Sequence, residues 1–267
     1  MRGTSIPRLG YGTYDVSGER GAEAVATAID VGYRHVDTAR MYENEDVVGE
    51  GIRRSGIDRD DLFVATKFGH FTEPEPTPEY VRAAVAESRE ALGVDVIDLL
   101  YVHWPTDDYD PEVVFPVVND LRDDGAIRHL GVSNFTVDHL RDALAVSDAP
   151  ILANQVEMHP LLQQEELLDF LRDRNLSLVA YSPLAQGNVF DVPALREIAA
   201  KHGVSEARVS LAWLLSKEEV VPIPKATSEE HVRDNYAALD LELDDEDVAR
   251  IEAIDRTVRL ESPDFMW

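Results

Sequence analysis

Short, nearly continuous apolar runs alternate along the chain with longer stretches in which apolar residues recur every three or four positions. The runs are rich in Val, Ile, Leu and Ala, as at 62–67, 98–103 and 177–181. Continuous apolar runs are typical of strands buried on both faces of a parallel sheet, and the longer spacing is typical of amphipathic helices. The two patterns together predict strands and helices in regular alternation.

The pattern predicts eight strand–helix units along the chain. The strands are expected at about 9–14, with 12–14 already in the following loop, and at 32–37, 62–67, 98–103, 130–132, 151–156, 177–181 and 220–224. The helices are expected at about 21–31, 43–54, 78–92, 111–123, a segment ending near 146, 163–174, 192–202, 206–216, 229–239 and 244–254.

The simplest closure of eight such units is a (β/α)8 TIM barrel, an α/β fold of about this length. The alternative is an open doubly wound sheet, which would carry a glycine-rich phosphate-binding turn after its first strand. Gly10-Tyr11-Gly12-Thr13 lacks the third glycine of that turn and a helix cap behind it. The sequence shows no linker or low-complexity segment, so we expect a single barrel domain over residues 1–267.

Charge sets this chain apart more than its hydrophobic content does. Asp and Glu outnumber Lys and Arg by 52 to 25, which gives a formal net charge of −27. Such a surface repels nucleic acid and acidic membranes. The acidic residues are interleaved with the helical pattern, as in the proteins of salt-accumulating halophiles, where dense salt screens the self-repulsion.

Other features of the composition exclude further classes of protein. No apolar run is long enough to span a membrane, and residues 1–7 lack the apolar core of a signal peptide. The chain has no Cys, so a disulfide framework, a thiolate metal site and a Cys nucleophile are excluded. We therefore expect a cytoplasmic, monomeric protein whose partners are small molecules.

Polar side chains stand where the predicted strands end. In a (β/α)8 barrel the carboxyl ends of all strands meet at one rim, which is where barrel enzymes place their active sites. We therefore expect the strand-end side chains to surround one pocket. They belong to Asp37, Lys67, His103, Ser133, Asn134, Gln155, Tyr181, Ser182 and Lys225.

Asp37, Tyr42, Lys67 and His103 form a set suited to proton transfer. A free phenol has a pKa of about 10, which is too high for acid–base catalysis near neutrality. An adjacent Lys67 ammonium would lower the pKa of Tyr42, Asp37 would hold Lys67 in place, and His103 would position a substrate oxygen. Two simpler interpretations stay open: Lys67 only pairs with Asp37, or His103 is an ordinary core histidine.

The sequence offers no nucleophile elbow and no His cluster with metal-ligand spacing, so electrons would have to come from a bound cofactor. Residues 131–135 and Gln155 offer groups that can hold a carboxamide, and Tyr181 offers a ring for stacking. Residues 222–228 place a cation and hydroxyls before a predicted helix, where phosphate binds well. Thr227 and Ser228 can equally be plain helix caps, and Asn134 a turn residue.

Short motifs stand at the ends of the predicted strands in a fixed order and spacing. They are Gly10-Tyr11-Gly12-Thr13, Asp37-Thr38-Ala39 with Tyr42-Glu43-Asn44-Glu45, Thr66-Lys67, His103-Trp104-Pro105, Gly131-Val132-Ser133-Asn134-Phe135, Asn154-Gln155, Tyr181-Ser182-Pro183-Leu184 and Ile223-Pro224-Lys225. With these motifs the chain resembles the aldo-keto reductases over essentially its whole length. The resemblance implies a barrel that binds NADP(H) and uses Asp37, Tyr42, Lys67 and His103 as its catalytic residues, with Tyr42 as the general acid. The nicotinamide would lie on Tyr181.

The resemblance also implies a cofactor site and a substrate site, and no metal. The cofactor residues would be Gly12, Thr13, Asp37, Ser133, Asn134, Gln155, Tyr181, Ser182, Leu184, Ile223, Lys225, Thr227, Ser228, His231, Asp234 and Asn235. The substrate residues would be Tyr14, Tyr42, His103 and Trp104.

Two positions depart from the family pattern. Where the family usually has a Ser and an Arg that grip the 2′-phosphate of NADP, this chain has Ala226 and His231. Loss of an Arg–phosphate contact costs about 1.5–3 kcal/mol, or roughly ten- to a hundred-fold in binding. We therefore expect the protein to use NADP(H) with a weakened preference over NAD(H), and to accept NAD(H) as well.

The implied function is the reduction of small aldehydes or ketones, with sugars and dicarbonyls among the candidate substrates. The alternative is a non-catalytic, cofactor-binding subunit of the potassium-channel β-subunit type, which the complete set of four catalytic residues disfavours. His70, His139 and His159 are interpreted as structural or surface residues. Met266 and Trp267 would either cover the pocket as a lid or fray.

Overall fold

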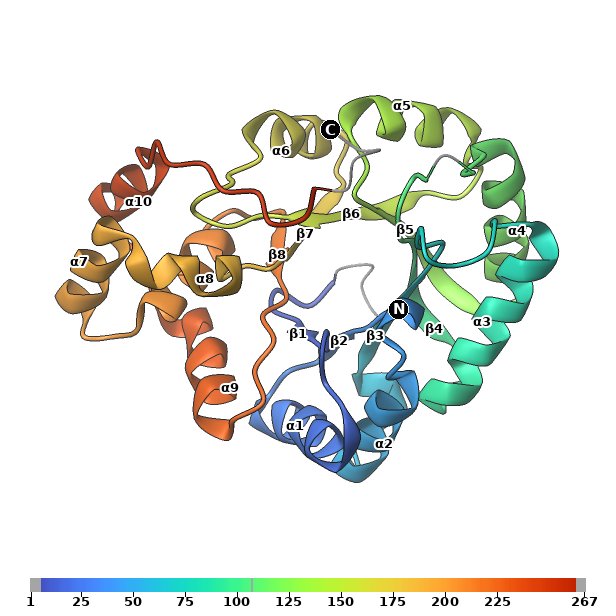
Figure 1. Ribbon diagram of the computed structural model, residues 1–267, viewed down its shortest axis with the longest axis horizontal. Coiled ribbons are helices and arrows are strands. Elements are labelled where there is room, and N and C mark those ends of the chain that lie inside the picture. The colour runs from blue at the N-terminus through green and yellow to red at the C-terminus, as the bar shows by residue number, and fades with distance from the viewer. Residues whose placement is uncertain (1–5, 107, 263–267) are drawn as a thin grey trace.

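The computed structural model describes residues 6–106 and 108–262. Eight parallel strands form one sheet in the order β1 to β8 (Figure 1). They are β1 (Tyr11–Gly12), β2 (His35–Asp37), β3 (Phe63–Phe68), β4 (Ile97–Val102), β5 (Ile127–Ser133), β6 (Ile151–Glu157), β7 (Ser177–Tyr181) and β8 (Val220–Pro222). The predicted (β/α)8 fold is confirmed.

The last strand returns to the first. The backbone N–H of Gly10 donates to the carbonyl of Pro222 at 3.0 Å, and that of Gly12 donates to Pro224 at 3.1 Å. A Cβ atom at Gly12 would lie 2.6 Å from the Ile223 carbonyl oxygen, so only glycine permits this close approach. The sequential strand order excludes the open doubly wound sheet.

Ten α-helices in the described part of the chain lie outside the strands (Figure 1). They are α1 (Gly18–Val31), α2 (Glu45–Ser55), α3 (Pro78–Leu92), α4 (Pro111–Asp123), α5 (Val137–Val146), α6 (Glu165–Arg172), α7 (Pro193–His202), α8 (Glu206–Leu215), α9 (Glu229–Tyr236) and α10 (Asp245–Glu252). Their order is the one predicted from the apolar spacing, and most bounds differ by only a few residues. No helix among residues 6–106 and 108–262 is long and apolar enough to cross a membrane.

The sequence pattern did not resolve four short 3-10 helices. They are η1 (Arg40–Tyr42), η2 (Arg59–Asp61), η3 (Ala185–Asp191) and η4 (Ala237–Asp240). The helix predicted from 43 begins at 45 because Glu43 is left-handed, with φ +52°. The Asn44 side chain turns back and donates to the carbonyls of Thr13 and Val16, both at 2.8 Å. This turn separates Tyr42 from α2.

The core has two parts. A large cluster lies between the strands and the helices, and a smaller cluster fills the barrel with residues such as Leu99, Ala153 and Val179. The filled interior leaves the carboxyl-terminal rim as the place for a site. The lid expectation for Met266 and Trp267 concerns residues outside those that the structure describes.

Candidate active site

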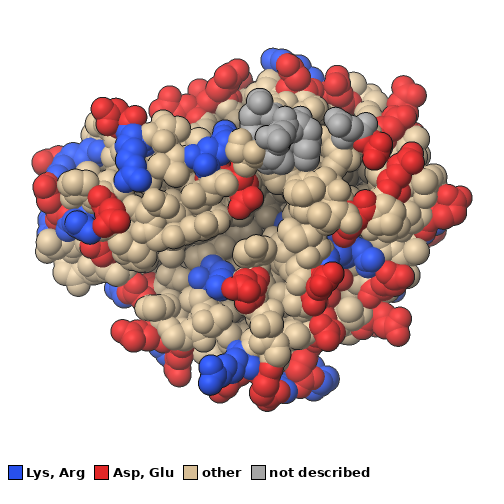
Figure 2. All heavy atoms as spheres, in the orientation of Figure 1, with Lys and Arg blue, Asp and Glu red and all other residues tan. Residues whose placement is uncertain are grey.

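A cavity of about 850 Å³ opens at the carboxyl ends of the strands. Figure 2 shows the hollow at the centre of this face. Most of the predicted site residues line it, as the convergence of strand ends requires. Those residues are Gly12, Thr13, Tyr14, Asp37, Tyr42, His103, Trp104, Ser133, Asn134, Gln155, Tyr181, Ser182, Leu184, Ile223 and Lys225.

Asp37, in the cavity lining, and Lys67, behind it, form a buried ion pair. Lys67 Nζ lies 2.5 Å from Asp37 Oδ1, and the two side chains are 1% and 2% exposed. Lys67 also donates to the Thr38 carbonyl at 2.7 Å, and Gln155 Nε2 donates to Asp37 Oδ2 at 2.8 Å. The pairing with Asp37 that was left open from the sequence is therefore real.

The ion pair fixes the charge of both groups. Burial alone would raise the pKa of Asp37, but the Lys67 ammonium and the neighbouring His35 outweigh it and lower that pKa. Burial likewise works to lower the pKa of Lys67, yet the charge of Asp37 raises it above its usual value. Lys67 is thus a fixed ammonium at neutral pH.

Tyr42, at the end of η1, lines the cavity above this pair. Lys67 Nζ lies 5.2 Å from the centroid of its ring. Burial raises the pKa of Tyr42, and the opposing pull of Lys67 is smaller. The expectation of a lowered pKa is therefore wrong, because removal of the phenol from water outweighs the nearby ammonium. Tyr42 keeps its proton at neutral pH.

His103 follows β4, where its backbone N–H donates to the Phe68 carbonyl at 2.7 Å. Its ring centroid lies 6.2 Å from that of Tyr42. Burial, followed by the charges of Lys67 and His70, lowers the pKa of His103 well below its usual value. Its Nδ1 has no hydrogen-bond partner among the described residues. His103 is therefore a neutral imidazole with unused hydrogen-bonding capacity beside the phenol, rather than a satisfied core histidine.

Asn134, Ser133 and Tyr181 form a hydrogen-bonded cluster in the cavity lining, next to His103. The Tyr181 hydroxyl donates to Asn134 Oδ1 at 2.9 Å, while Asn134 Nδ2 donates to the His103 carbonyl at 3.1 Å and to Ser133 Oγ at 3.2 Å. Asn134 is left-handed, with φ +63°, so it is a turn residue as well. The cluster fixes the Tyr181 ring at the cavity wall, which suits a flat heterocycle.

Several predicted cofactor residues lie outside the cavity lining, on and before α9. Ser228 Oγ accepts from the His231 backbone N–H at 3.3 Å, so Ser228 is a helix cap. Asp234 accepts from Ser205 Oγ and, at 2.5 Å, from Arg208 Nη2. The residues outside the lining are Thr227, Ser228, His231, Asp234 and Asn235. A cofactor long enough to reach them would extend past Lys225 at the cavity edge.

Other cavity residues were not predicted from the sequence, because loops bring them to the cavity. Pro183 and Pro224 lie within two of the family motifs, which could have indicated them. The others carry no local signal. The lining residues that were missed are Asp15, Met41, His70, Phe71, Pro183, Gln186, Gly187, Phe190, Pro224, Glu261 and Ser262.

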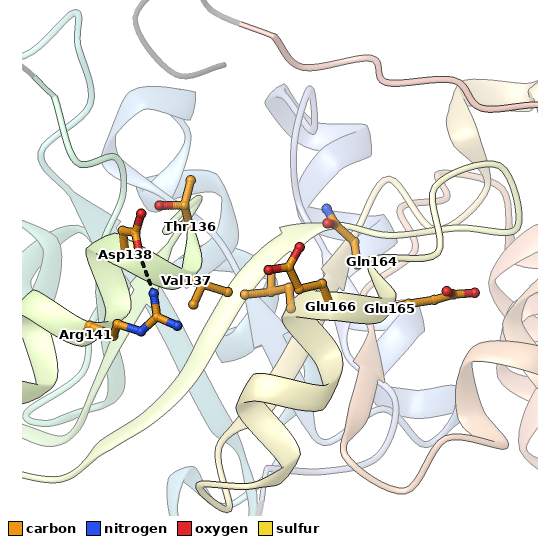
Figure 3. A pocket seen from close by; sticks show the side chains of 8 residues that line it. Thr136, Val137, Asp138, Arg141, Gln164, Glu165 and Glu166 are labelled. Carbon is orange, nitrogen blue, oxygen red and sulfur yellow. Dashed lines mark hydrogen bonds and ion pairs between the residues drawn. The ribbon is translucent and has the colours of Figure 1, made fainter.

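A second hollow, of about 520 Å³, lies between the start of α5 and the start of α6 (Figure 3). Arg141 Nη1 meets Asp138 Oδ1 at 2.5 Å on one side, and Glu165 and Glu166 lie on the other. It contains none of the predicted site residues. The predicted site residues that line a cavity are therefore gathered in the one at the strand ends.

A filled barrel with a phenol, an ammonium–carboxylate pair and a neutral imidazole on its rim has the build of a (β/α)8 oxidoreductase. The model of the aldo/keto reductase family matches residues 8–256. The chain belongs to this family, and it is an NAD(P)H-dependent oxidoreductase that reduces carbonyl compounds.

Named relatives cover almost the whole chain. Glyoxal reductase of Bacillus subtilis is 39% identical over 259 residues, which is 97% of this chain and 92% of the relative. Methylglyoxal reductase DkgB of Yersinia pestis is 36% identical over 266 residues, 97% of each chain. The crystal structure of MGS-M4, an aldo-keto reductase enzyme from a deep-sea metagenome library of the Medee basin, superposes with a TM-score of 0.91. It is 32% identical and covers 97% of this chain and 94% of its own.

Proposed function

We propose that the protein reduces small aldehydes and ketones with Tyr42 as the general acid. The observation that carries this proposal is the protonated phenol of Tyr42 at the cavity wall, between the fixed ammonium of Lys67 and the neutral ring of His103. When bound, the nicotinamide cofactor would supply the hydride. Tyr42 gives its proton to the carbonyl oxygen, and Lys67 stabilises the phenolate that remains. Asp37 positions Lys67, and His103 donates a hydrogen bond to the same oxygen.

The cavity fits such a cofactor on this chain's own residues. The Tyr181 ring is held by Asn134 and offers a face for the nicotinamide, and Ser133 and Gln155 stand beside it. Lys225 supplies a cation at the cavity edge, ahead of α9. We assign Tyr14 and Trp104, which also line the cavity, to the substrate side. The relatives described above are named as reductases, and nothing here favours the non-catalytic channel-subunit alternative.

The Tyr42→Phe variant tests the assigned acid. Removal of a general acid lowers the rate about a hundred- to ten-thousand-fold, so aldehyde-dependent oxidation of NADPH should fall by that factor while cofactor binding remains. Tyr109→Phe is the matched control, because the Tyr109 hydroxyl is buried and has no hydrogen-bond partner among the described residues. Undiminished turnover by Tyr42→Phe would refute the role of Tyr42.

The phosphate end of the cofactor site supports relaxed cofactor choice. Ala226 has no hydroxyl to offer, and His231 is exposed in the first turn of α9. Lys225 is then the remaining cation of the 222–228 stretch for a 2′-phosphate. We infer that the enzyme uses NADP(H) with a weakened preference and accepts NAD(H) as well.

We further propose that residues 1–267 form one domain that acts as a monomer in the cytoplasm of a salt-accumulating cell. The family model spans residues 8–256, which supports a single unit. The net charge of −27 supports the salt-rich setting.

A further inference from the structure

The loop behind β3 brings a second imidazole to the cavity. Gly69, with φ +79°, turns the chain just after the strand. The Glu73 carboxylate accepts from the backbone N–H groups of Gly69 at 2.7 Å and His70 at 3.2 Å, which fixes the turn. His70 is only 6% exposed and lines the cavity. A buried imidazole held in place beside the proposed reaction centre is positioned to contact a substrate.

Thr72 determines which ring nitrogen of His70 carries the proton. The Thr72 backbone N–H, which can only donate, donates to His70 Nδ1 at 3.2 Å, so we assign Nδ1 as the acceptor. The Thr72 hydroxyl lies 2.7 Å from the same nitrogen and, in this tautomer, donates to it as well. Burial lowers the pKa of His70 to about 4, so the ring is neutral and its single proton sits on Nε2. None of the hydrogen bonds within the described residues engages Nε2. The ring lines the cavity and also a smaller hollow of about 190 Å³ beside it, and its remaining N–H is not used by the described part of the protein.

His70 and His103 form a pair of neutral donors. Their ring centroids are 5.0 Å apart, with the rings inclined at 52°. A hydrogen bond reaches about 3 Å from the ring nitrogen, so two oxygens on adjacent carbons can each meet one ring. Since neither ring is charged at neutral pH, the pair suits uncharged oxygens rather than a carboxylate.

We propose that His70 is a specificity residue that donates Nε2–H to the second oxygen of a substrate with oxygens on two adjacent carbons. His103 and Tyr42 hold the oxygen of the carbonyl that is reduced. The favoured substrates are then small 1,2-dicarbonyls. This inference rests on the proposed function, because it assigns the reacting oxygen to Tyr42.

The His70→Phe variant tests the proposal with two three-carbon aldehydes, methylglyoxal and propanal. The ring shape is kept while the donor is lost. We expect kcat/KM for methylglyoxal to fall about tenfold, as for the loss of one hydrogen bond, and that for propanal to change less than about threefold. Comparing each substrate with itself in the two proteins cancels differences in intrinsic reactivity. His70→Gln, whose amide can donate, should recover part of the loss for methylglyoxal alone.

Equal loss for both aldehydes, with NADPH binding retained, would show that His70 only supports the loop and would overturn the proposal. No loss for either aldehyde would overturn it as well. Wild-type turnover of both aldehydes keeps the proposed function intact in these cases. Absence of wild-type turnover with either aldehyde would instead overturn the proposed function and this inference together.

Discussion

Charge states at the rim depend on the immediate surroundings of each side chain. Lys67 and Asp37 stay charged because they meet at 2.5 Å, whereas His103 and His70 stay neutral because burial lowers the pKa of each imidazole. Tyr42 stays protonated because burial raises its pKa against the pull of Lys67. At neutral pH these side chains are therefore a protonated phenol, a charged ion pair and two neutral imidazoles, which is the set that the proposed reduction with Tyr42 as general acid needs.

Residue identity should also decide cofactor choice. The double variant Ala226→Ser with His231→Arg should raise kcat/KM for NADPH about ten- to a hundred-fold and leave that for NADH nearly unchanged, because only NADPH carries the 2′-phosphate. Steady-state kinetics with both cofactors measure this. Glu230→Gln, at an exposed position on the same helix, also makes the helix one unit more positive and controls for that change alone. A preference of the wild-type enzyme for NADPH above about a thousand-fold would contradict the inferred relaxed choice.

At the scale of elements, one carboxylate helps to tie the C-terminal segment to the barrel, together with a hydrogen bond from the Val258 backbone N–H to the Leu161 carbonyl at 2.8 Å. Glu157, at the end of β6, accepts from the backbone N–H of Leu260 at 2.9 Å and from that of Glu261 at 2.9 Å. His159 Nε2 lies 2.8 Å from the same carboxylate. Figure 1 shows the segment crossing the barrel next to β7. Glu261 and Ser262 reach the cavity through this contact.

Glu157→Gln should loosen this segment. We expect amide hydrogen exchange at Leu260 and Glu261 to accelerate about tenfold, since both amides lose a charged acceptor, while exchange in the β-strands stays unchanged. Exchange followed by mass spectrometry or NMR measures it. Glu165→Gln, an exposed position on α6, is the matched control. Equal protection in the two variants would show that the carboxylate charge does not hold the segment.

The same contact should depend on pH. Burial acts to raise the pKa of Glu157, but the hydrogen bonds from His159, Glu261 and Leu260 outweigh burial and lower it below the usual value. A carboxyl group with a lowered pKa in the folded state stabilises the fold above its unfolded-state pKa. That stabilisation is lost as the pH falls through the folded-state value, so acidification should loosen the segment as the variant does.

For the whole molecule, the distribution of charge separates the site from the surface. The net charge is −27, and Figure 2 shows acidic side chains gathered around the periphery while mostly uncharged residues surround the hollow. The repulsion between acidic side chains therefore arises mainly at the outer surface and not in the cavity. Repulsion of this kind destabilises the compact state unless salt screens it.

Stability should therefore rise with salt. Between 0.1 and 1 M KCl the Debye length falls from about 10 to about 3 Å, and we expect Tm to rise by more than about 5 °C, or roughly 2 kcal/mol for a chain of this size. Thermal unfolding followed by circular dichroism measures this, and NaCl should act as KCl does if screening is the cause. A Tm that does not change with salt would contradict the proposed adaptation to a salt-rich cell.

The order of the elements and the fold class can be predicted from the amino-acid pattern alone. The spacing of apolar residues distinguishes buried strands from amphipathic helices. Eight strand–helix units in succession predict a closed barrel. The same pattern predicts that Asp37, Lys67 and His103 meet, because barrel topology turns a position at a strand end into proximity on one rim. The predicted bounds of α3, Pro78–Leu92, agree with the structure. Thr77 caps the start of this helix and Gly93 ends it.

The pKa of Tyr42 and the loop and tail residues of the cavity depend on the tertiary structure. The direction of the pKa of Tyr42 depends on how much water the fold removes, which no local pattern records. His70 and Glu261 reach the cavity through a glycine turn and through a contact with Glu157, 104 positions away from Glu261. Loops and tails take their places from packing against segments distant in the sequence, whereas strands carry their own signal. The spacing of apolar residues therefore specifies the barrel. Contacts between segments distant in the sequence bring the remaining residues to the cavity.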